Sequence, residues 1–422
     1  MNTPQTTKDM LGRSALISVN EAQHIMLRQL EGIRLSSETI SLPDSLDRIL
    51  AVSVESCENL PPHPRSVMDG FAVIARDTFG ASESMPCYLQ ISGSVAMGEM
   101  PVGTVEKCNC YRIATGGFMP AGADAVVMHE HTVPVDDTMV EVTKSCGSGT
   151  SIIGIGDDIR KGEIAVPAGR RLRPQDLGLL AALGVVDVEV FRKIRVGVMS
   201  TGDEIIPHHE TPRGGQIRNI NSITLAAMAK RCGAEVFDYG IVSDNRDTFL
   251  PTLHQAVREN DLVLFSGGSS VGVRDLGEQA IEAIGPPGIL VHGVKLKPGK
   301  PVIIGFSDKT PVFGLPGHPV SALVCFDLFI KPAIDRISGI AAPPHPSASI
   351  MATLGRNINS AAGRLDLVRV QLRNSNTGPV ADPVLGRSGA ISTLARAHGY
   401  FLIDEDSQGV TQGSTIEVFL YS

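Results

Sequence analysis

One stretch of the chain, residues 191–338, alternates short apolar runs with segments of helical periodicity. The apolar runs predict strands at Ile194 to Met199, Glu235 to Tyr239, Leu262 to Phe265 and Val312 to Gly314. The other segments predict helices at Ser222 to Cys232, Arg246 to Glu259, Leu276 to Ile284 and from Pro319 onward. Such alternation is typical of an αβα three-layer domain with a mostly parallel sheet. In such a domain, ligands gather at the carboxyl edge of the sheet.

The rest of the chain predicts further domains. Residues 49–149 contain short alternating or apolar runs separated by Pro and Gly, which is typical of a β-rich domain. Residues 18–48 and 150–190 each carry a predicted helix, and we expect them to pair as a mixed domain. After a Pro-rich linker, residues 347–422 return to short β runs and predict a second β domain. The expected fold class is therefore multidomain α/β plus β.

The composition limits what the chain binds. Its 37 Lys and Arg against 45 Asp and Glu give a formal net charge of −8, so we expect no nucleic-acid partner. Any anionic ligand must then meet cations that are gathered locally. Seven cysteines without a CxxC pair favour a reduced cytoplasmic protein. We expect no membrane partner, because the longest apolar stretch, Leu177 to Val186, is half of the roughly 20 residues that a membrane helix needs.

Three acidic residues follow predicted strands of the αβα domain. Glu204, Asp244 and Asp275 are far apart in the sequence but occupy equivalent places in the predicted fold. Because parallel strands end at one edge of the sheet, we expect the three carboxylates to converge there. Mg²⁺ prefers oxygen ligands and often bridges to phosphates or oxyanions, so the trio predicts a magnesium site. The alternative for each residue alone is a helix cap or a solvated loop position.

A glycine-rich loop of the same domain predicts anion binding. Residues 266–272 read Ser-Gly-Gly-Ser-Ser-Val-Gly and link a buried strand to a helix. The backbone N–H groups of such a loop, with the dipole of the following helix, favour an anion. Gly267, Gly268 and Ser270 are the candidate residues.

A lysine-containing loop and a proline-rich turn predict a second anion cradle. Residues 297–301 read Lys-Pro-Gly-Lys-Pro and place Lys297 and Lys300 on a stiff loop. Residues 315–319 read Leu-Pro-Gly-His-Pro and lead into a helix with Ser321 in its first turn. The alternative for the lysines is a solvated surface position, which their acidic surroundings make less favourable. The candidate residues are Lys297, Lys300, Pro316, Pro319 and Ser321.

Two polar turns and one histidine pair stand out in the β-rich stretch. Arg65 to Gly70 and Arg112 to Gly117 have the composition of ordinary turns. His129-Glu130-His131 places two histidines on one face of a predicted strand without a third ligand nearby, so we interpret them as ordinary strand residues rather than a metal site.

Considered together, several motifs in order make the chain similar to a known family. They are Leu60-Pro61-Pro62, Ser66 to Gly70, Arg112 to Gly116, Ser200 to Glu204, Ser266 to Asp275, Lys297 to Pro301 and Gly314 to Ala322. From about residue 18 to its C-terminus, the sequence resembles the MoeA, Cnx1 E-domain and gephyrin E-domain family of molybdopterin molybdenumtransferases. The resemblance implies a cytoplasmic enzyme of molybdenum cofactor biosynthesis that joins molybdate to adenylylated molybdopterin and releases AMP.

The resemblance also implies an architecture. A homodimer of elongated four-domain subunits is expected, with residues 18–48 and 150–190 as an elongated mixed domain. Residues 191–338 would be the molybdopterin-binding domain and residues 347–422 a C-terminal β-barrel-like domain. Each active cleft would combine the β-rich domain of one subunit with the αβα and C-terminal domains of the other. Contacts with the molybdopterin adenylyltransferase and with acceptor molybdoenzymes are implied as well.

The family's site residues transfer to matching positions of this chain. Glu204, Asp244 and Asp275 would bind Mg²⁺ or position the phosphoanhydride. Asp69 and Thr115 would complete the site from the other subunit. The residues implied to hold molybdate are Lys297, Lys300, Ser321, Arg369 and Ser392.

Some positions depart from the family pattern. His318 stands where the family often has Asn, Ser269 where Val is common, and Arg218-Asn219 where Tyr-Asp is usual. These departures leave open a tungsten-specific paralogue. Two different functions also stay open. One is a molybdopterin adenylyltransferase, which has a similar αβα domain, and the second is a non-enzymatic scaffold like the gephyrin E domain.

Overall fold

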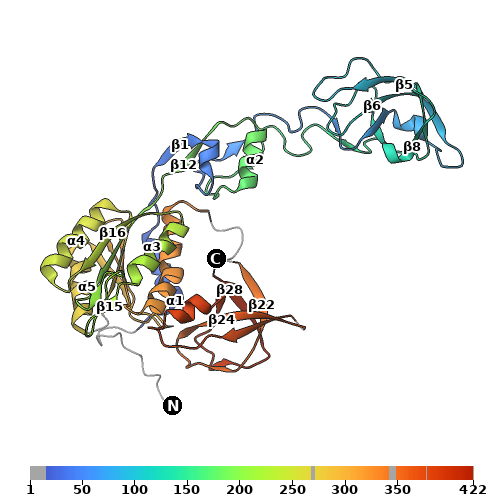
Figure 1. Ribbon diagram of the computed structural model, residues 1–422. Helices are drawn as coiled ribbons and strands as arrows, with labels where there is room; N and C mark the ends of the chain where they lie inside the picture. The colour runs from blue at the N-terminus through green and yellow to red at the C-terminus, as the bar shows by residue number, and fades with distance from the viewer. Residues whose placement is uncertain (1–15, 268–270, 342–347, 377, 422) are drawn as a thin grey trace, which may run out of the picture.

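The computed structural model describes residues 16–421 except 268–270, 342–347 and 377, and the side chains of residues 271–275 are also outside the description. Figure 1 shows an elongated molecule. The αβα domain and the C-terminal strands lie together at one end, the β-rich domain lies at the other, and a small region with β1, β12 and α2 lies between them. The multidomain α/β plus β class is confirmed.

A six-stranded sheet forms the middle layer of the αβα domain, in the order β16-β13-β17-β21-β20-β18. Its strands are β13 (Arg195–Thr201), β16 (Glu235–Val242), β17 (Leu262–Gly267), β18 (Pro287–His292), β20 (Ile303–Ser307) and β21 (Thr310–Leu315). The first four in spatial order pair in parallel, as predicted. Strand β20 runs antiparallel to both neighbours. The sequence pattern does not predict β18 and β20, because Gly288 and Gly305 interrupt their apolar runs.

Helices cover both faces of this sheet. They are α1 (Val19–Gln29), α3 (Asn221–Arg231), α4 (Arg246–Glu259), α5 (Val271–Ala283), α6 (Pro319–Cys325) and α7 (Lys331–Ile337). On one face α4 and α5 share a core that includes Phe249 and Ile281, and on the other face the remaining helices share a second core. Helix α5 begins at Val271, before the predicted start at Leu276. Asp275 therefore lies within the helix and not in the loop before it.

The region between the two ends of the molecule consists of short strand pairs and one helix. Its elements are β1 (Ser37–Ser41) with β12 (Asp187–Phe191), β2 (Val54–Glu55) with β11 (Ile164–Val166), β3 (Arg65–Ser66) with β10 (Ile152–Ile153), and α2 (Pro174–Ala182). Leu50, Leu172 and Leu180 are fully buried in its small core. Helix α1 does not join this core, because its buried residues Ala22 and Met26 pack in the αβα domain.

The β-rich domain is built on a second six-stranded sheet, in the order β7-β4-β6-β5-β9-β8. Its strands are β4 (Gly70–Val73), β5 (Cys87–Val95), β6 (Asn109–Ile113), β7 (Ala125–Met128), β8 (Thr132–Pro134) and β9 (Met139–Val142). The predicted strand conformation of His129-Glu130-His131 is wrong, since these residues form a single 3₁₀ turn between β7 and β8. The hydrogen bond from Thr132 Oγ1 to the His129 carbonyl, at 2.8 Å, stabilises that turn.

A closed five-stranded barrel forms the C-terminal domain. Its strands are β22 (Ser349–Leu354), β24 (Leu365–Ser375), β25 (Gly378–Pro383), β26 (Gly399–Ile403) and β28 (Thr415–Leu420). They pair in the order β24-β25-β22-β28-β26, and β26 returns to β24 to close the ring. Strand β19 (Leu296–Lys297) of the αβα domain pairs in parallel with β24 and joins the two domains. Among the residues that the structure describes, no helix is long and apolar enough to cross a membrane.

Candidate active site

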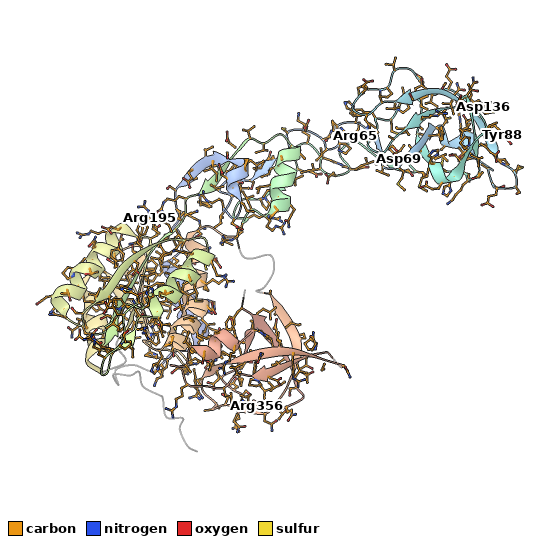
Figure 2. The ribbon with its side chains drawn as sticks, in the orientation of Figure 1. Arg65, Asp69, Tyr88, Asp136, Arg195 and Arg356 are labelled. Carbon is orange, nitrogen blue, oxygen red and sulfur yellow. The ribbon has the colours of Figure 1, made fainter. Side chains whose placement is uncertain are left out.

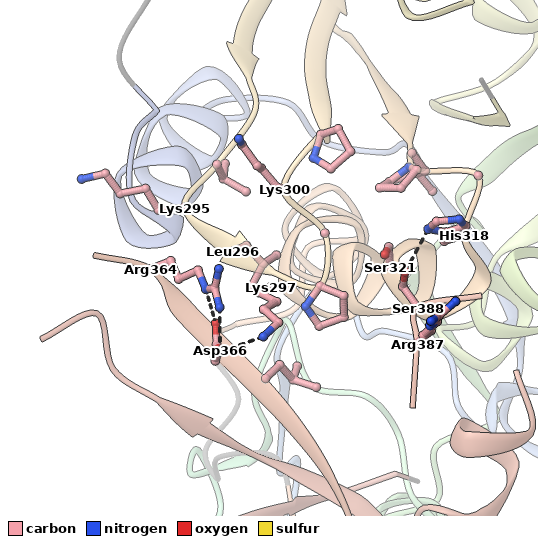
Figure 3. Close-up of a pocket in the computed structure, with 18 of the residues that line it drawn as sticks. Lys295, Leu296, Lys297, Lys300, His318, Ser321, Arg364, Asp366, Arg387 and Ser388 are labelled. Atoms are coloured by element: carbon pink, nitrogen blue, oxygen red, sulfur yellow. Dashed lines mark hydrogen bonds and ion pairs between the residues drawn. The ribbon is translucent and has the colours of Figure 1, made fainter. Parts of the chain in front are cut away.

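A cavity of about 770 Å³ lies between the αβα domain and the barrel (Figure 3). Its walls include the loop of residues 294–301, the turn of residues 314–318, and segments 358–369 and 384–388 of the barrel domain. The basic side chains that line it are Lys295, Lys297, Lys300, Arg364, Arg369 and Arg387. Asp366 is the single acidic residue among the described residues of its lining. In a chain with a net charge of −8, this concentration of cations predicts an anionic ligand.

Asp366 balances two of these cations. The residue is 5% exposed, and its carboxylate accepts a hydrogen bond from Arg364 Nε at 2.7 Å and lies 3.7 Å from Lys297 Nζ. The pairing of β19 with β24 sets this contact, because it places Lys297 directly beside Asp366 in the register. The sequence motifs identify Lys297 but not Arg364 and Asp366.

Arg369 is a buried cation without a carboxylate partner among the described residues. It lies on β24 with 8% of its surface exposed, and one guanidinium nitrogen donates to the Gly386 carbonyl at 3.2 Å. Its Nε atom is buried and has no hydrogen-bond acceptor within the described part of the structure. Burial lowers the pKa of Arg369. A buried charge is costly unless an opposite charge accompanies it, so this side chain is suited to an anion in the cavity.

The turn before α6 and the start of that helix are hydrogen-bonded to the barrel domain at the cavity wall. His318 Nδ1 and Ser388 Oγ form a hydrogen bond at 2.9 Å, and the Val320 N–H donates to the Ser388 carbonyl at 3.1 Å. Ser321, in the first turn of α6, is buried and lines the cavity together with Pro316. Pro319 begins the helix, as predicted, but is not part of the lining.

Ser392 is exposed at the start of α8 (Ser392–Arg396) and is outside the cavity lining. Ser388 occupies the cavity wall instead. Both serines lie within residues 388–397, and the backbone path between them decides which one lines the cavity.

Several carboxylate side chains lie close together at the carboxyl edge of the sheet, beyond the ends of β13 and β16. Thr201 Oγ1 donates to Asp244 Oδ1, and the Asp244 N–H donates to Asp203 Oδ1 at 3.1 Å. The pKa of Asp244 is raised, first by burial and then by the negative charges of Asp203 and Glu204. The predicted convergence of Glu204 and Asp244 is therefore present in the structure. Asp203, which the sequence motifs do not single out, joins them.

The remaining candidates of this edge are only partly described. Gly267 ends β17 and lies so close to β13 that an added Cβ would meet the Thr201 carbonyl oxygen at 1.9 Å. Gly268 and Ser270 lie outside the described residues, and so does the side chain of Asp275. Among described side chains, no group of three or more His, Cys, Asp or Glu has a geometry that could hold a metal ion.

Asp69 and Thr115 form a separate polar turn in the β-rich domain. Asp69 Oδ1 accepts from the Thr115 N–H at 2.7 Å and from Thr115 Oγ1 at 3.0 Å. These hydrogen bonds, backbone first, lower the pKa of the exposed Asp69, and His129 adds to the effect. Figure 2 places Asp69 at the opposite end of the molecule from Arg356 of the barrel domain. Within one chain, Asp69 and Thr115 are therefore far from the cavity.

The departures from the family pattern also have defined contacts. Asn219 accepts from Ser200 Oγ at 2.9 Å and donates to Ser222 Oγ at 2.9 Å, within a buried hydroxyl network beneath the acidic edge. Arg218 Nε donates to the Glu210 carbonyl at 3.0 Å. Ser269 lies outside the described residues.

Comparisons with known proteins cover nearly the whole chain. Family models described as the MoeA N-terminal region (domain I and II), a probable molybdopterin binding domain and the MoeA C-terminal region (domain IV) match residues 17–184, 197–336 and 351–421. A putative molybdopterin biosynthesis protein of Methanocaldococcus jannaschii is 34% identical over 90% of this chain and 91% of its own length. A molybdopterin molybdenumtransferase of Haemophilus influenzae is 31% identical over 96% of this chain and 98% of its own length.

A solved structure extends this likeness to the fold. The molybdopterin biosynthesis MoeA protein of Pyrococcus horikoshii OT3 is 30% identical, covers 96% of this chain and 100% of its own, and superposes with a TM-score of 0.82.

Proposed function

The chain belongs to the MoeA family of molybdopterin molybdenumtransferases, and on that premise we propose that it joins molybdate to the dithiolene of adenylylated molybdopterin, with release of AMP. The observation that carries this proposal is the cation-lined cavity with the buried Arg369 at its wall. Tetrahedral oxyanions such as molybdate require a few charge-assisted hydrogen bonds, and Arg369, Lys300 and Ser321 supply donors of this kind.

Magnesium is a further part of the proposal. Burial raises the pKa of Asp244, and repulsion from the negative charges of Asp203 and Glu204 raises it further. A divalent cation at this edge would relieve that repulsion, and carboxylate oxygens are its preferred ligands. Glu204 and Asp244, with Asp275 from α5, are the residues that would hold it. When bound, Mg²⁺ would neutralise charge on the phosphoanhydride.

A homodimer is proposed because the Asp69–Thr115 turn lies at the far end of the subunit from the cavity (Figure 1). If this turn takes part in the reaction, it must approach the cavity of another copy. The elongated shape permits two subunits to place their β-rich domains at one another's cavities, since each β-rich domain projects away from its own αβα domain.

An adenylyltransferase and a pure scaffold are less well supported. An adenylyltransferase needs no barrel domain, whereas the matches extend through residues 351–421. A pure scaffold would not require the buried Arg369, whose charge no carboxylate among the described residues balances. We keep molybdate over tungstate as the proposed substrate because the Haemophilus influenzae relative is named a molybdopterin molybdenumtransferase. A cytoplasmic location and contacts with the adenylyltransferase and with acceptor molybdoenzymes belong to the same proposal.

The experiment is a measurement of AMP release from adenylylated molybdopterin as a function of molybdate concentration. We expect wild-type release to depend on molybdate. Arg369→Ala should reduce kcat/KM for molybdate by about ten- to a hundredfold, the value of one charge-assisted hydrogen bond. Arg373→Ala is the matched control, because Arg373 lies on the same strand but pairs with Asp382 at the surface. Release that does not respond to molybdate, or equal loss in both variants, would contradict the proposal.

A further inference from the structure

The loop of residues 386–388 forms one wall of the cavity and carries an arginine that no sequence motif identifies. Gly386, Arg387 and Ser388 all line the cavity. In Figure 3, Arg387 and Ser388 lie near Ser321 and His318, while Lys297, Arg364 and Asp366 form a separate group. The loop therefore belongs to the end of the cavity away from Asp366.

Both neighbours of Arg387 are held in place. The Gly386 carbonyl accepts from the Arg369 guanidinium at 3.2 Å, which ties the loop to the barrel. Ser388 is tied to the αβα domain twice, by its carbonyl to the Val320 N–H at 3.1 Å and by its hydroxyl to His318 Nδ1 at 2.9 Å. The backbone of Arg387 is thus fixed between two domains, so less backbone conformational entropy is lost when its side chain binds a ligand.

The charge of Arg387 is not balanced within the described part of the chain. Its side chain is exposed, and no carboxylate pairs with it there. Arg364, across the cavity, differs because Asp366 accepts its Nε–H at 2.7 Å. An arginine presents a planar fork of donors that matches the oxygens of a tetrahedral anion. Among the residues that the structure describes, no carboxylate balances the charges of Arg387 and the buried Arg369 at this end of the cavity.

We propose that Arg387 is a further substrate-binding residue, that it contacts a tetrahedral oxyanion in this cavity, and that His318 is its positioning residue through the bond to Ser388. The oxyanion is molybdate or the phosphate of the nucleotide, which share this chemistry. The assignment rests on the proposed function for the identity of the substrates, but the binding of an oxyanion can be measured without turnover.

The test uses calorimetric titration of the full chain with molybdate and, separately, with AMP. We expect Arg387→Ala to weaken binding of at least one of them by about ten- to a hundredfold, and Arg387→Lys to lose less because it keeps the charge. Arg396→Ala is the matched control, since Arg396 is an exposed arginine on α8 outside the cavity lining. Binding of both anions unchanged in Arg387→Ala would overturn the proposal. Absence of AMP release by the wild type, with anion binding intact, would count against the proposed function alone.

The role of His318 is tested by a double-mutant cycle. His318→Ala should weaken binding of the same anion by about three- to tenfold. His318→Asn should bind the anion nearly as tightly as the wild type, because an Asn amide can occupy the place of Nδ1. In the Arg387→Ala background, His318→Ala should add little, since the residue that it positions is gone. Fully additive losses, or no effect of His318→Ala, would overturn the positioning role.

Discussion

At the scale of single residues, charge compensation distinguishes the two lysines of the loop at residues 297–301. Lys297 Nζ lies 3.7 Å from Asp366 Oδ2, and Arg364 binds the same carboxylate at 2.7 Å. Lys300 lines the same cavity, and within the described part of the chain it has no carboxylate partner. An anion is attracted more strongly by a cation whose charge is not already balanced.

This difference predicts unequal effects of the two alanine variants. Lys300→Ala should raise the molybdate concentration for half-maximal AMP release by about ten- to a hundredfold, and Lys297→Ala by less than about tenfold. Higher molybdate should restore the rate in both cases. Steady-state kinetics with molybdate varied at saturating pterin nucleotide makes the comparison. A larger effect of Lys297→Ala would mean that Asp366 orients Lys297 for the anion instead of neutralising it.

At the scale of elements, α6 continues into α7 through a π-helical segment, η4 (Phe326–Ile330). Asp327 lies in this segment, and burial raises its pKa to about 6 against the opposing effect of Lys331 and Arg231. The folded state therefore binds a proton at Asp327 more tightly than the unfolded state does. The resulting stabilisation is complete below the unfolded pKa near 3.8 and is lost as the pH rises through about 6.

Asp327→Asn should consequently stabilise the protein at pH 8 by about 1–2 kcal/mol, because the amide mimics the protonated carboxyl. At pH 4 the variant and the wild type should differ little. Thermal unfolding at both pH values measures this. Asp335→Asn is the control, since it removes a surface ion pair with Lys331 and should not stabilise at pH 8. A variant that is less stable than the wild type at pH 8 would contradict the assignment.

The contact between β13 and β17 gives a second prediction at this scale. A Cβ at position 267 would meet the Thr201 carbonyl oxygen at 1.9 Å, so Gly267→Ala must displace the backbone of one strand. We expect a loss of about 1–3 kcal/mol in the free energy of unfolding. Gly215→Ala, where no atom of the described residues lies within 4 Å of an added Cβ, should be close to neutral. Denaturant unfolding of both variants decides this, and equal midpoints would show that the strands can separate at no cost.

At the scale of the whole molecule, the β-rich domain and the cavity lie at opposite ends of an elongated subunit (Figure 1). The Asp69–Thr115 turn and the acidic edge at Asp244 therefore belong to different ends of one chain. A site that uses both must be assembled from two subunits.

Coexpression of Asp69→Ala and Asp244→Ala subunits tests this assembly. Each homodimer should be inactive, whereas a heterodimer should contain one intact site. With random pairing, half of the dimers are mixed, so about a quarter of the wild-type activity is expected. AMP release by the purified mixture is the measurement, with each variant alone as the control. No recovery in the mixture would place each site within a single subunit.

Local patterns in the sequence were sufficient to predict many of the helices and strands of the αβα domain. Helix α4 spans Arg246–Glu259 as predicted, because its cap at Asn245 and its apolar spacing are properties of neighbouring residues. The parallel core strands also follow from local runs and from their alternation with helices. These features are enough to predict that Glu204 and Asp244 lie at one edge of the sheet.

Tertiary structure alone decided which distant side chains meet. Asp366 balances Lys297 across the register of β19 and β24, and His318 reaches Ser388 between two domains. The same holds for the packing of α1 against the αβα core and for the presence of Ser388, not Ser392, in the cavity wall. Each of these contacts depends on the path of all the residues between the partners. Periodicity and motif spacing describe neighbours along the chain, whereas the charge balance of the cavity is set by distances through space.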